Sequence, residues 1–381
     1  MDILQGREAQ LDLIRGVAIL GIALLNVFSF AIPSFYSFDL YWHQQAISAL
    51  DEWLYQLQHL FLQGRFRTLL TLLFGVGLWL VAMPTLISDG KNLLAHQQKI
   101  RRRYLALALF GFCHISFFWS GDITFWYALS ALLMLAFGFL KLTASAQWRV
   151  GLALILISVL MNYAAAWAYI LNAPTVELGL TDEEIMTEQA LQQGPILELW
   201  QQIFFENMLT LVGFCTNLAW LNIGTMLIGI SLYRQGFFQN GMSRWQEILL
   251  LLIALSLDYC GLFISAGFYT LLNFWYDFSA LLMALVFCSW LVKWRNQGWL
   301  TRWLQICGQM ALSLYFLQTL LFLLWFRTLN PEWYANAERW QLMSLACVVM
   351  LLSLGFAVGW RHFFRLGPLE WCWRRFYQRP L

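Results

Sequence analysis

Long apolar runs, separated by short segments that carry most of the charge, repeat along the whole chain. A helix needs about 20 mainly apolar residues to cross the hydrocarbon core of a membrane. The pattern predicts an all-α, polytopic membrane bundle of about ten transmembrane helices in a single domain over residues 1–381. The predicted helices cover residues 13–35, 66–87, 103–120, 122–142, 149–171, 203–232, 246–268, 272–294, 309–328 and 340–362.

Three segments do not fit a simple alternation of helix and short loop. Segment 45–62 is amphipathic and too polar to span, so we expect it to lie along the outer membrane surface. The predicted helix 203–232 is long enough to be tilted or to begin outside the membrane. The predicted outer loop 172–200 carries six acidic residues and no basic one: Glu177, Asp182, Glu183, Glu184, Glu188 and Glu198.

Composition supports a membrane protein. Of the 381 residues, 60% are hydrophobic and only 12% are charged, whereas soluble domains carry about 25% charged residues. So few charges cannot cover a water-facing surface, so we expect the lipid bilayer to be the main partner and expect no nucleic acid. We expect the first apolar run to be a retained helix, because no convincing small-residue cleavage site follows it.

The distribution of basic residues indicates the orientation. With the N-terminus inside and the ten helices alternating, all but four of the 23 Lys and Arg residues fall on the inside. Positively charged loops stay on the cytoplasmic side, so this layout predicts that both termini are cytoplasmic. The four exceptions are Arg65, Arg67, Arg327 and Arg339.

Polar residues within the apolar runs are the functional candidates, because each ionisable group there is costly unless paired or hydrated. Asp12 and Arg15 are three residues apart and can pair on one helix face. Asn26 lies eleven residues beyond Arg15, which is about 16 Å deeper along a helix. The group is either a topology anchor with an interhelical hydrogen bond or part of a site.

A second group lies on and after the third predicted helix. Arg101, Arg102 and Arg103 form a basic cytoplasmic rim that either holds phosphates or marks the cytoplasmic side. His114 lies eleven residues further along, near mid-membrane, and is either a satisfied core residue or a general base. Asp122 is suited to cap the next helix.

Two arginines and two aspartates complete the set. Arg65 and Arg67 stand at the outer start of the second helix, and we expect at least one to pair with Asp122 or another outer carboxylate. They form either structural salt bridges or an anion site. Asp258 and Asp277 are either proton-relay carboxylates, as in transporters, or hydrogen-bonded packing residues.

Familiar signatures of soluble enzymes are missing from the chain. It has no Walker motif, no GxSxG elbow, no HExxH and no paired His or Cys spacing for a metal. We therefore expect no metal and no bound cofactor.

Five strings together resemble one family. The chain is similar to the YeiB-type family of bacterial inner-membrane proteins, which is functionally uncharacterised. The resemblance covers nearly the whole chain and implies a location in the bacterial inner membrane. The strings run from Asp12 to Asn26, from Gly64 to Gly77, from Gly111 to Tyr127, from Gly308 to Gln318 and from Gly367 to Trp371.

A more distant resemblance concerns mechanism. Arg15, ten residues and Asn26 resemble the first-helix pattern of the transmembrane acyltransferase superfamily. Its O-acetyltransferase branch has a histidine where this chain has Asn26, and its heparan-glucosaminide branch has an asparagine. The latter branch has a catalytic histidine shortly downstream. No histidine occurs at that spacing here, so His114 is the candidate base.

The first functional hypothesis is an acyltransferase. Acyl-CoA, a co-substrate, would place its phosphates near Arg15, Arg101, Arg102 and Arg103, and the acceptor would be a periplasmic or membrane-embedded glycan or lipid. His114 would take the acceptor's proton and Asn26 would stabilise the oxyanion. Both lie eleven residues beyond an arginine at the inner interface, so they share a depth if their helices are neighbours.

The alternative is a proton-coupled transporter or permease of a small solute or lipid. Asp258 and Asp277 would carry the coupling protons, and His114 would join the relay. The two hypotheses differ in which residues are essential. Acceptor, acyl chain and oligomeric state stay open at this point.

Overall fold

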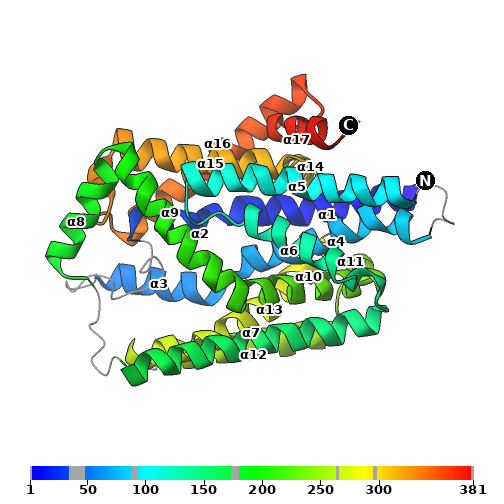
Figure 1. The fold of residues 1–381 in the computed structure, drawn as a ribbon, viewed down its shortest axis with the longest axis horizontal. Coiled ribbons are helices and arrows are strands. Elements are labelled where there is room, and N and C mark those ends of the chain that lie inside the picture. The colour runs from blue at the N-terminus through cyan, green and yellow to red at the C-terminus, as the bar shows by residue number, and fades with distance from the viewer. Residues whose placement is uncertain are drawn as a thin grey trace.

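The computed structural model describes residues 2–33, 48–87, 93–172, 180–262, 266–294 and 298–378. These residues form an elongated bundle of helices (Figure 1). The N-terminal helix and the C-terminal helix lie at one end of the bundle, and the acidic helix α8 lies at the other. Seven stretches of the described chain are long and apolar enough to cross a membrane, so the fold is a helical membrane bundle.

Every predicted span contains helix in the structure. The helices are α1 (Asp2–Gly21), α2 (Ala23–Ala31), α3 (Ala49–Phe61), α4 (Arg65–Ile87), α5 (Leu93–Phe117), α6 (Thr124–Ala136), α7 (Ala144–Asn172), α8 (Asp182–Gln193), α9 (Ile196–Gly213), α10 (Ala219–Arg234), α11 (Phe237–Asn240), α12 (Arg244–Leu262), α13 (Ala266–Lys293), α14 (Trp299–Gln309), α15 (Ala311–Leu324), α16 (Arg339–Phe363) and α17 (Pro368–Gln378).

Several predicted spans are interrupted, two of them near the middle. The first consists of α1 and α2, and the backbone of Ile22 between them stays right-handed helical. The predicted helix 203–232 is broken by a π-helical segment, η3 (Phe214–Leu218), between α9 and α10. One extra residue per turn in such a segment rotates the side chains that follow, which redirects α10 relative to α9.

The described part of the predicted outer loop 172–200 is mostly helical. Helix α8 begins with a capping box in which Thr181 and Glu184 each bond the other's backbone amide. This motif satisfies amide groups that the first helical turn leaves unpaired. Residues 173–179, which include Glu177, lie outside the described residues.

The orientation predicted for segment 45–62 is also wrong. Helix α3 lies along the bundle in Figure 1, in contact with α12 and α16, rather than across its end. Its apolar side chains Leu50, Trp53, Leu57 and Phe61 are exposed. Such an exposed apolar stripe is suited to face lipid, because hydrocarbon accepts apolar side chains that water does not.

Among the short helices that the sequence did not predict, α14 and α17 shape the terminal end of the bundle. Helix α14 packs against α1 so closely that a Cβ on Gly308 would lie 1.9 Å from the carbonyl oxygen of Asp12. A Cβ on Gly16 would lie 1.8 Å from the carbonyl oxygen of Leu304. Membrane helices approach this closely only where small residues face each other. Helix α17 lies at the same end, against α5 and α15.

Candidate functional site

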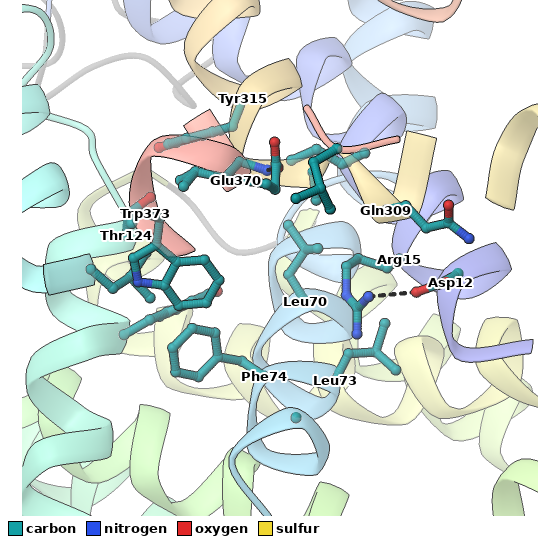
Figure 2. A pocket seen from close by; sticks show the side chains of 18 of the residues that line it. Asp12, Arg15, Leu70, Leu73, Phe74, Thr124, Gln309, Tyr315, Glu370 and Trp373 are labelled. Carbon is teal, nitrogen blue, oxygen red and sulfur yellow. Dashed lines mark hydrogen bonds and ion pairs between the residues drawn. The ribbon is translucent and has the colours of Figure 1, made fainter. Parts of the chain in front are cut away.

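A cavity of about 550 Å³ lies at the end of the bundle that carries both termini. Helices α1, α4, α5, α15 and α17 contribute to its wall. Figure 2 shows Arg15 and Trp373 on opposite sides of the cavity, with Leu70, Leu73 and Phe74 of α4 between them. The inner wall is therefore apolar.

The cavity is lined by more positive than negative charge. Asp12 and Glu370 are its acidic residues, and Asp12 pairs with Arg15 at 2.7 Å. Glu370 is occupied by hydrogen bonds from α15, as described below. The excess of guanidinium groups makes the cavity suited to an anion, since arginine binds phosphate and carboxylate through paired N–H groups. Its arginines are Arg15, Arg103, Arg361, Arg365 and Arg374.

Helix α17 is fixed to the bundle by Glu370. This carboxylate accepts hydrogen bonds from the amides of Leu312 (2.8 Å) and Ser313 (3.1 Å) and from the Ser313 hydroxyl. Those amides belong to the first turn of α15, where a negative charge is favoured. Burial raises the pKa of the Glu370 carboxyl, although the hydrogen bonds from Ser313 and the backbone oppose the shift.

A second contact of α17 is with α5. The Arg103 guanidinium lies over the Trp373 ring at 4.2 Å and donates to the Tyr377 hydroxyl at 3.2 Å. The Trp373 indole N–H donates to the Arg103 carbonyl oxygen at 2.9 Å. A guanidinium over an indole face is an attractive cation–π arrangement. Helix α17 is thus attached on two sides of the cavity.

A buried histidine–aspartate pair lies deeper in the bundle. His114 Nδ1 is 2.9 Å from Asp122 Oδ1, and His114 Nε2 is 3.1 Å from Thr319 Oγ1. The side chains of His114 and Asp122 are 1% and 0% exposed. The second oxygen of Asp122 accepts the amide of Phe125 at 2.7 Å, near the start of α6. Asp122 therefore both caps α6, as predicted, and orients the imidazole.

Tyr315 separates the cavity from this pair. It lines the cavity, and its ring lies 5.2 Å from the His114 ring. Its hydroxyl accepts the amide of Ile123, the residue after Asp122, at 3.1 Å. The cavity wall is therefore connected directly to the buried pair.

Beyond the pair, toward the α8 end, lies an outer pocket of about 330 Å³. Ser29, Trp119, Ser120 and Glu206 line it, and they also line an adjoining smaller pocket. The Trp119 ring is edge-on to the His114 ring at 6.4 Å. The pair thus lies between the inner cavity, through Tyr315, and the outer pocket, through Trp119.

Three helical stretches repeat one pattern from the cavity to the outer pockets. Each stretch has a residue in the cavity wall, then a polar residue, then a residue in the wall of an outer pocket. Successive members are three, four or seven residues apart, which places them on the same face of a helix. These are Ile19, Asn26 and Ser29 on α1 and α2; Leu107 and His114 on α5, with Phe118 directly after its end; and Tyr315, Thr319 and Leu323 on α15. Asn26 is half-buried.

The three arginines predicted as a basic rim do not all reach the cavity. Arg103 lines the cavity, whereas Arg101 and Arg102 do not. Arg101 is exposed. Arg15, predicted from the first helix, lines the same cavity. Arg15 and Arg103, the two arginines that precede Asn26 and His114 by eleven residues, therefore line the same cavity.

Arg65 and Arg67 pair with aspartates other than Asp122. The fully buried Arg65 bonds the Asp258 carboxylate, which also accepts from the Ser279 hydroxyl. Arg67 Nη2 lies 2.9 Å from Asp277 Oδ1. The two proton-relay candidates are thus each bound by an arginine, tying the start of α4 to α12 and α13.

Several residues of the site were missed from sequence. Thr319 carries no local signal, because threonine is common within apolar helices and usually bonds its own backbone. Glu370 belongs to one of the motifs of the YeiB-type family, but its part in fixing α17 depends on contact with α15. Within the described ranges, no three His, Cys, Asp or Glu side chains are grouped to hold a metal ion.

Comparison with known proteins identifies related chains but no activity. A family model described as "Protein of unknown function (DUF418)" matches residues 232–380. The chain is 28% identical to the "Uncharacterized protein YeiB" of Escherichia coli K12, across 97% of this chain and 96% of that protein. It is 26% identical to an uncharacterised 39.9 kDa protein of Bacillus acidopullulyticus, across 97% and 94% of the two chains. It is also 32% identical to the uncharacterised protein YxaH of Bacillus subtilis 168, across 39% and 37%. No solved structure matches the chain.

Proposed function

We propose that this chain, which belongs to the YeiB-type family of membrane proteins, is an acyltransferase that works across the bilayer. It would take an acyl group from cytoplasmic acyl-CoA and pass it to a periplasmic or membrane-embedded glycan or lipid. One observation carries the proposal: a buried His114–Asp122 pair lies between an arginine-lined cavity and an outer pocket.

The proposed orientation has about ten membrane crossings, with both termini in the cytoplasm and the chain in the bacterial inner membrane. Both termini lie at one end of the bundle, which supports this arrangement. The same end carries the exposed Arg101 and the cavity arginines, as the positive-inside rule requires. The acidic helix α8 lies at the opposite, outer end.

The donor would bind through its charge and its flexible arm. Acyl-CoA is an anionic amphiphile, with phosphates at one end and a thioester at the other. Its phosphates would contact Arg361, Arg365 and Arg374, and its arm would lie along Leu70 and Phe74 toward Tyr315. The cavity thus offers arginines for the phosphates and an apolar wall for the arm.

The buried pair would move the proton. Asp122 accepts from Nδ1–H of His114, which leaves Nε2 with a lone pair for a hydroxyl proton. As a hydroxyl oxygen attacks the thioester carbon, His114 takes its proton and then passes it to the departing CoA sulfur. Asn26 lies seven residues beyond the cavity residue Ile19, as His114 lies seven beyond Leu107, and would donate to the developing oxyanion.

The transporter alternative has less support from the geometry. It needs Asp258 and Asp277 to gain and lose protons during transport, but each is bound by an arginine. Each ion pair would have to break before its aspartate could take part in a proton relay. We retain proton-flux measurements on these two aspartates for the case in which no acyl-CoA binds.

The test is acyl-CoA binding to the purified protein in detergent, measured by calorimetry. Arg374→Ala should weaken binding of CoA and acetyl-CoA by about 10- to 150-fold, since a charge-assisted hydrogen bond contributes about 1.5–3 kcal/mol. Arg375→Ala is the matched control, because this neighbour does not line the cavity. His114→Gln should keep binding and lose turnover by roughly 10²–10⁴-fold. Absence of binding at millimolar ligand would exclude the acyltransferase.

A further inference from the structure

We propose that Thr319 is the nucleophile that carries the acyl group between the two cavities as a covalent ester. This inference rests on the proposed acyltransferase function and adds its intermediate. Thr319 has no part in the expectations drawn from the sequence. Its position relative to His114, Asp122 and the two cavities carries the assignment.

The first argument is the hydrogen-bond chain. Asp122, His114 and Thr319 are joined at 2.9 and 3.1 Å, and Thr319 is 1% exposed. With the Nδ1 proton donated to Asp122, Nε2 accepts from the Thr319 hydroxyl at 3.1 Å, and the Tyr315 carbonyl oxygen at 3.4 Å is the second acceptor within reach of that hydroxyl. A hydroxyl, an imidazole and an aspartate in this order form the arrangement that activates serine and threonine nucleophiles.

The position of Thr319 along α15 is the second argument. Tyr315 lines the inner cavity and Leu323 lines an outer pocket, at four residues on either side of Thr319. Residues four apart lie on the same helix face. A single side chain between them can receive a group from one side and release it to the other. No continuous channel is then needed, so the bilayer stays sealed to ions.

The chemistry balances without any further reactant. Thr319 Oγ1 attacks the thioester carbon while His114 takes the hydroxyl proton, and the carbon–sulfur bond breaks. The proton goes to the sulfur, and CoA leaves as a free thiol to the cytoplasmic side. An acceptor hydroxyl or amine from the outer pocket then attacks the ester, and its proton returns through His114 to Thr319.

Tyr315 has to move for the first step. Its side chain stands between the cavity and His114, and its hydroxyl accepts the amide of Ile123. Filling the cavity would displace the ring and bring the thioester within reach of Thr319. A donor that does not fill the cavity would leave the ring in place, which protects the thioester from attack.

The experiment uses isotope exchange, which needs no acceptor. The purified protein in detergent is incubated with unlabelled acyl-CoA and radiolabelled CoA, using acetyl, butyryl and palmitoyl chains in turn. A covalent intermediate makes the label exchange into acyl-CoA. Wild type and Thr319→Ser should exchange, and Thr319→Val should lose at least 100-fold. Mass spectrometry of the acid-quenched protein should locate an alkali-labile acyl group at Thr319.

Each result decides the matter. If Thr319 serves only as a hydrogen-bond partner of the buried imidazole, Thr319→Val will still transfer acyl groups to membrane extracts, and wild type will show neither exchange nor adduct. That result would overturn the covalent intermediate at Thr319 and leave the proposed acyltransferase function intact. If wild type neither binds acyl-CoA nor transfers, the proposed function itself fails. Thermal melting of both variants excludes loss of folding as the cause, and Thr319→Ser tests the carrier if the valine variant does not fold.

Discussion

At the scale of single residues, the two arginine–aspartate pairs differ in burial, and that difference determines what each contributes. The side chains of Arg65 and Asp258 are 0% and 2% exposed, whereas those of Arg67 and Asp277 are 34% and 12% exposed. Removing one partner of a buried pair leaves an uncompensated charge in a medium of low dielectric. The deeper pair is therefore the more sensitive to substitution.

We expect Asp258→Asn to destabilise the protein by about 3–5 kcal/mol, because Arg65 loses its charge partner without access to water. Asp277→Asn should cost less, since about a third of the Arg67 side chain remains exposed. Thermal melting in detergent compares the two. A normally stable Asp258→Asn protein that lacks activity would instead show that this carboxylate works as a proton carrier.

At the scale of elements, α17 determines how the inner cavity is closed. Its contacts are both polar and aromatic. Glu370 bonds the first turn of α15, the Trp373 indole bonds the Arg103 carbonyl of α5, and the Phe376 ring packs edge-on against Phe110 of α5. Of these contacts, the one that can change with protonation is that of the Glu370 carboxyl.

This docking should depend on pH. Burial raises the pKa of Glu370 above 4.5 in the docked helix, whereas the carboxyl of an undocked α17 would titrate at its ordinary value. Docking of α17 is therefore strongest at pH values below the ordinary pKa of the undocked carboxyl. It weakens as the pH rises past the raised pKa of Glu370 in the docked helix. Hydrogen exchange of residues 368–378, expressed as protection factors, measures this. Glu370→Gln should remove the dependence; an unchanged pH profile in that variant would contradict the assignment.

At the scale of the whole molecule, the inner cavity and the outer pocket lie toward opposite ends of one bundle. The termini and the cavity arginines are at one end, and α8 is at the other. The buried His114 lies between them. An activity that uses one compartment's donor and another compartment's acceptor requires such a layout, so the orientation in the membrane is a direct test.

The orientation predicts opposite labelling of two engineered cysteines. In a variant without the seven native cysteines, Glu183→Cys on α8 should react with a membrane-impermeant maleimide in intact spheroplasts. Arg101→Cys on α5 should react only after the membrane is opened. Both positions are exposed, so access is set by the compartment. The reverse pattern would place the arginine-lined cavity outside and remove cytoplasmic acyl-CoA as its ligand.

The sequence by itself determined the helical membrane class and the position of each main helix. Apolar runs of membrane-spanning length leave the chain few alternatives, because a backbone in lipid must satisfy its own hydrogen bonds. The breaks at η3 and Ile22 and the short helices α14 and α17 were not predicted. They depend on contacts with other helices, not on local hydrophobic length.

Only the tertiary structure decided which polar residues meet. From the sequence, Asp122 could have bound Arg65, Arg67 or the start of α6. In the structure it binds His114 and caps α6, while Arg65 takes Asp258. Thr319 becomes a candidate nucleophile only because α15 places it beside His114, 205 positions away in the chain. A pattern along the chain gives the depth of a polar residue, but its partner depends on which helix faces pack together.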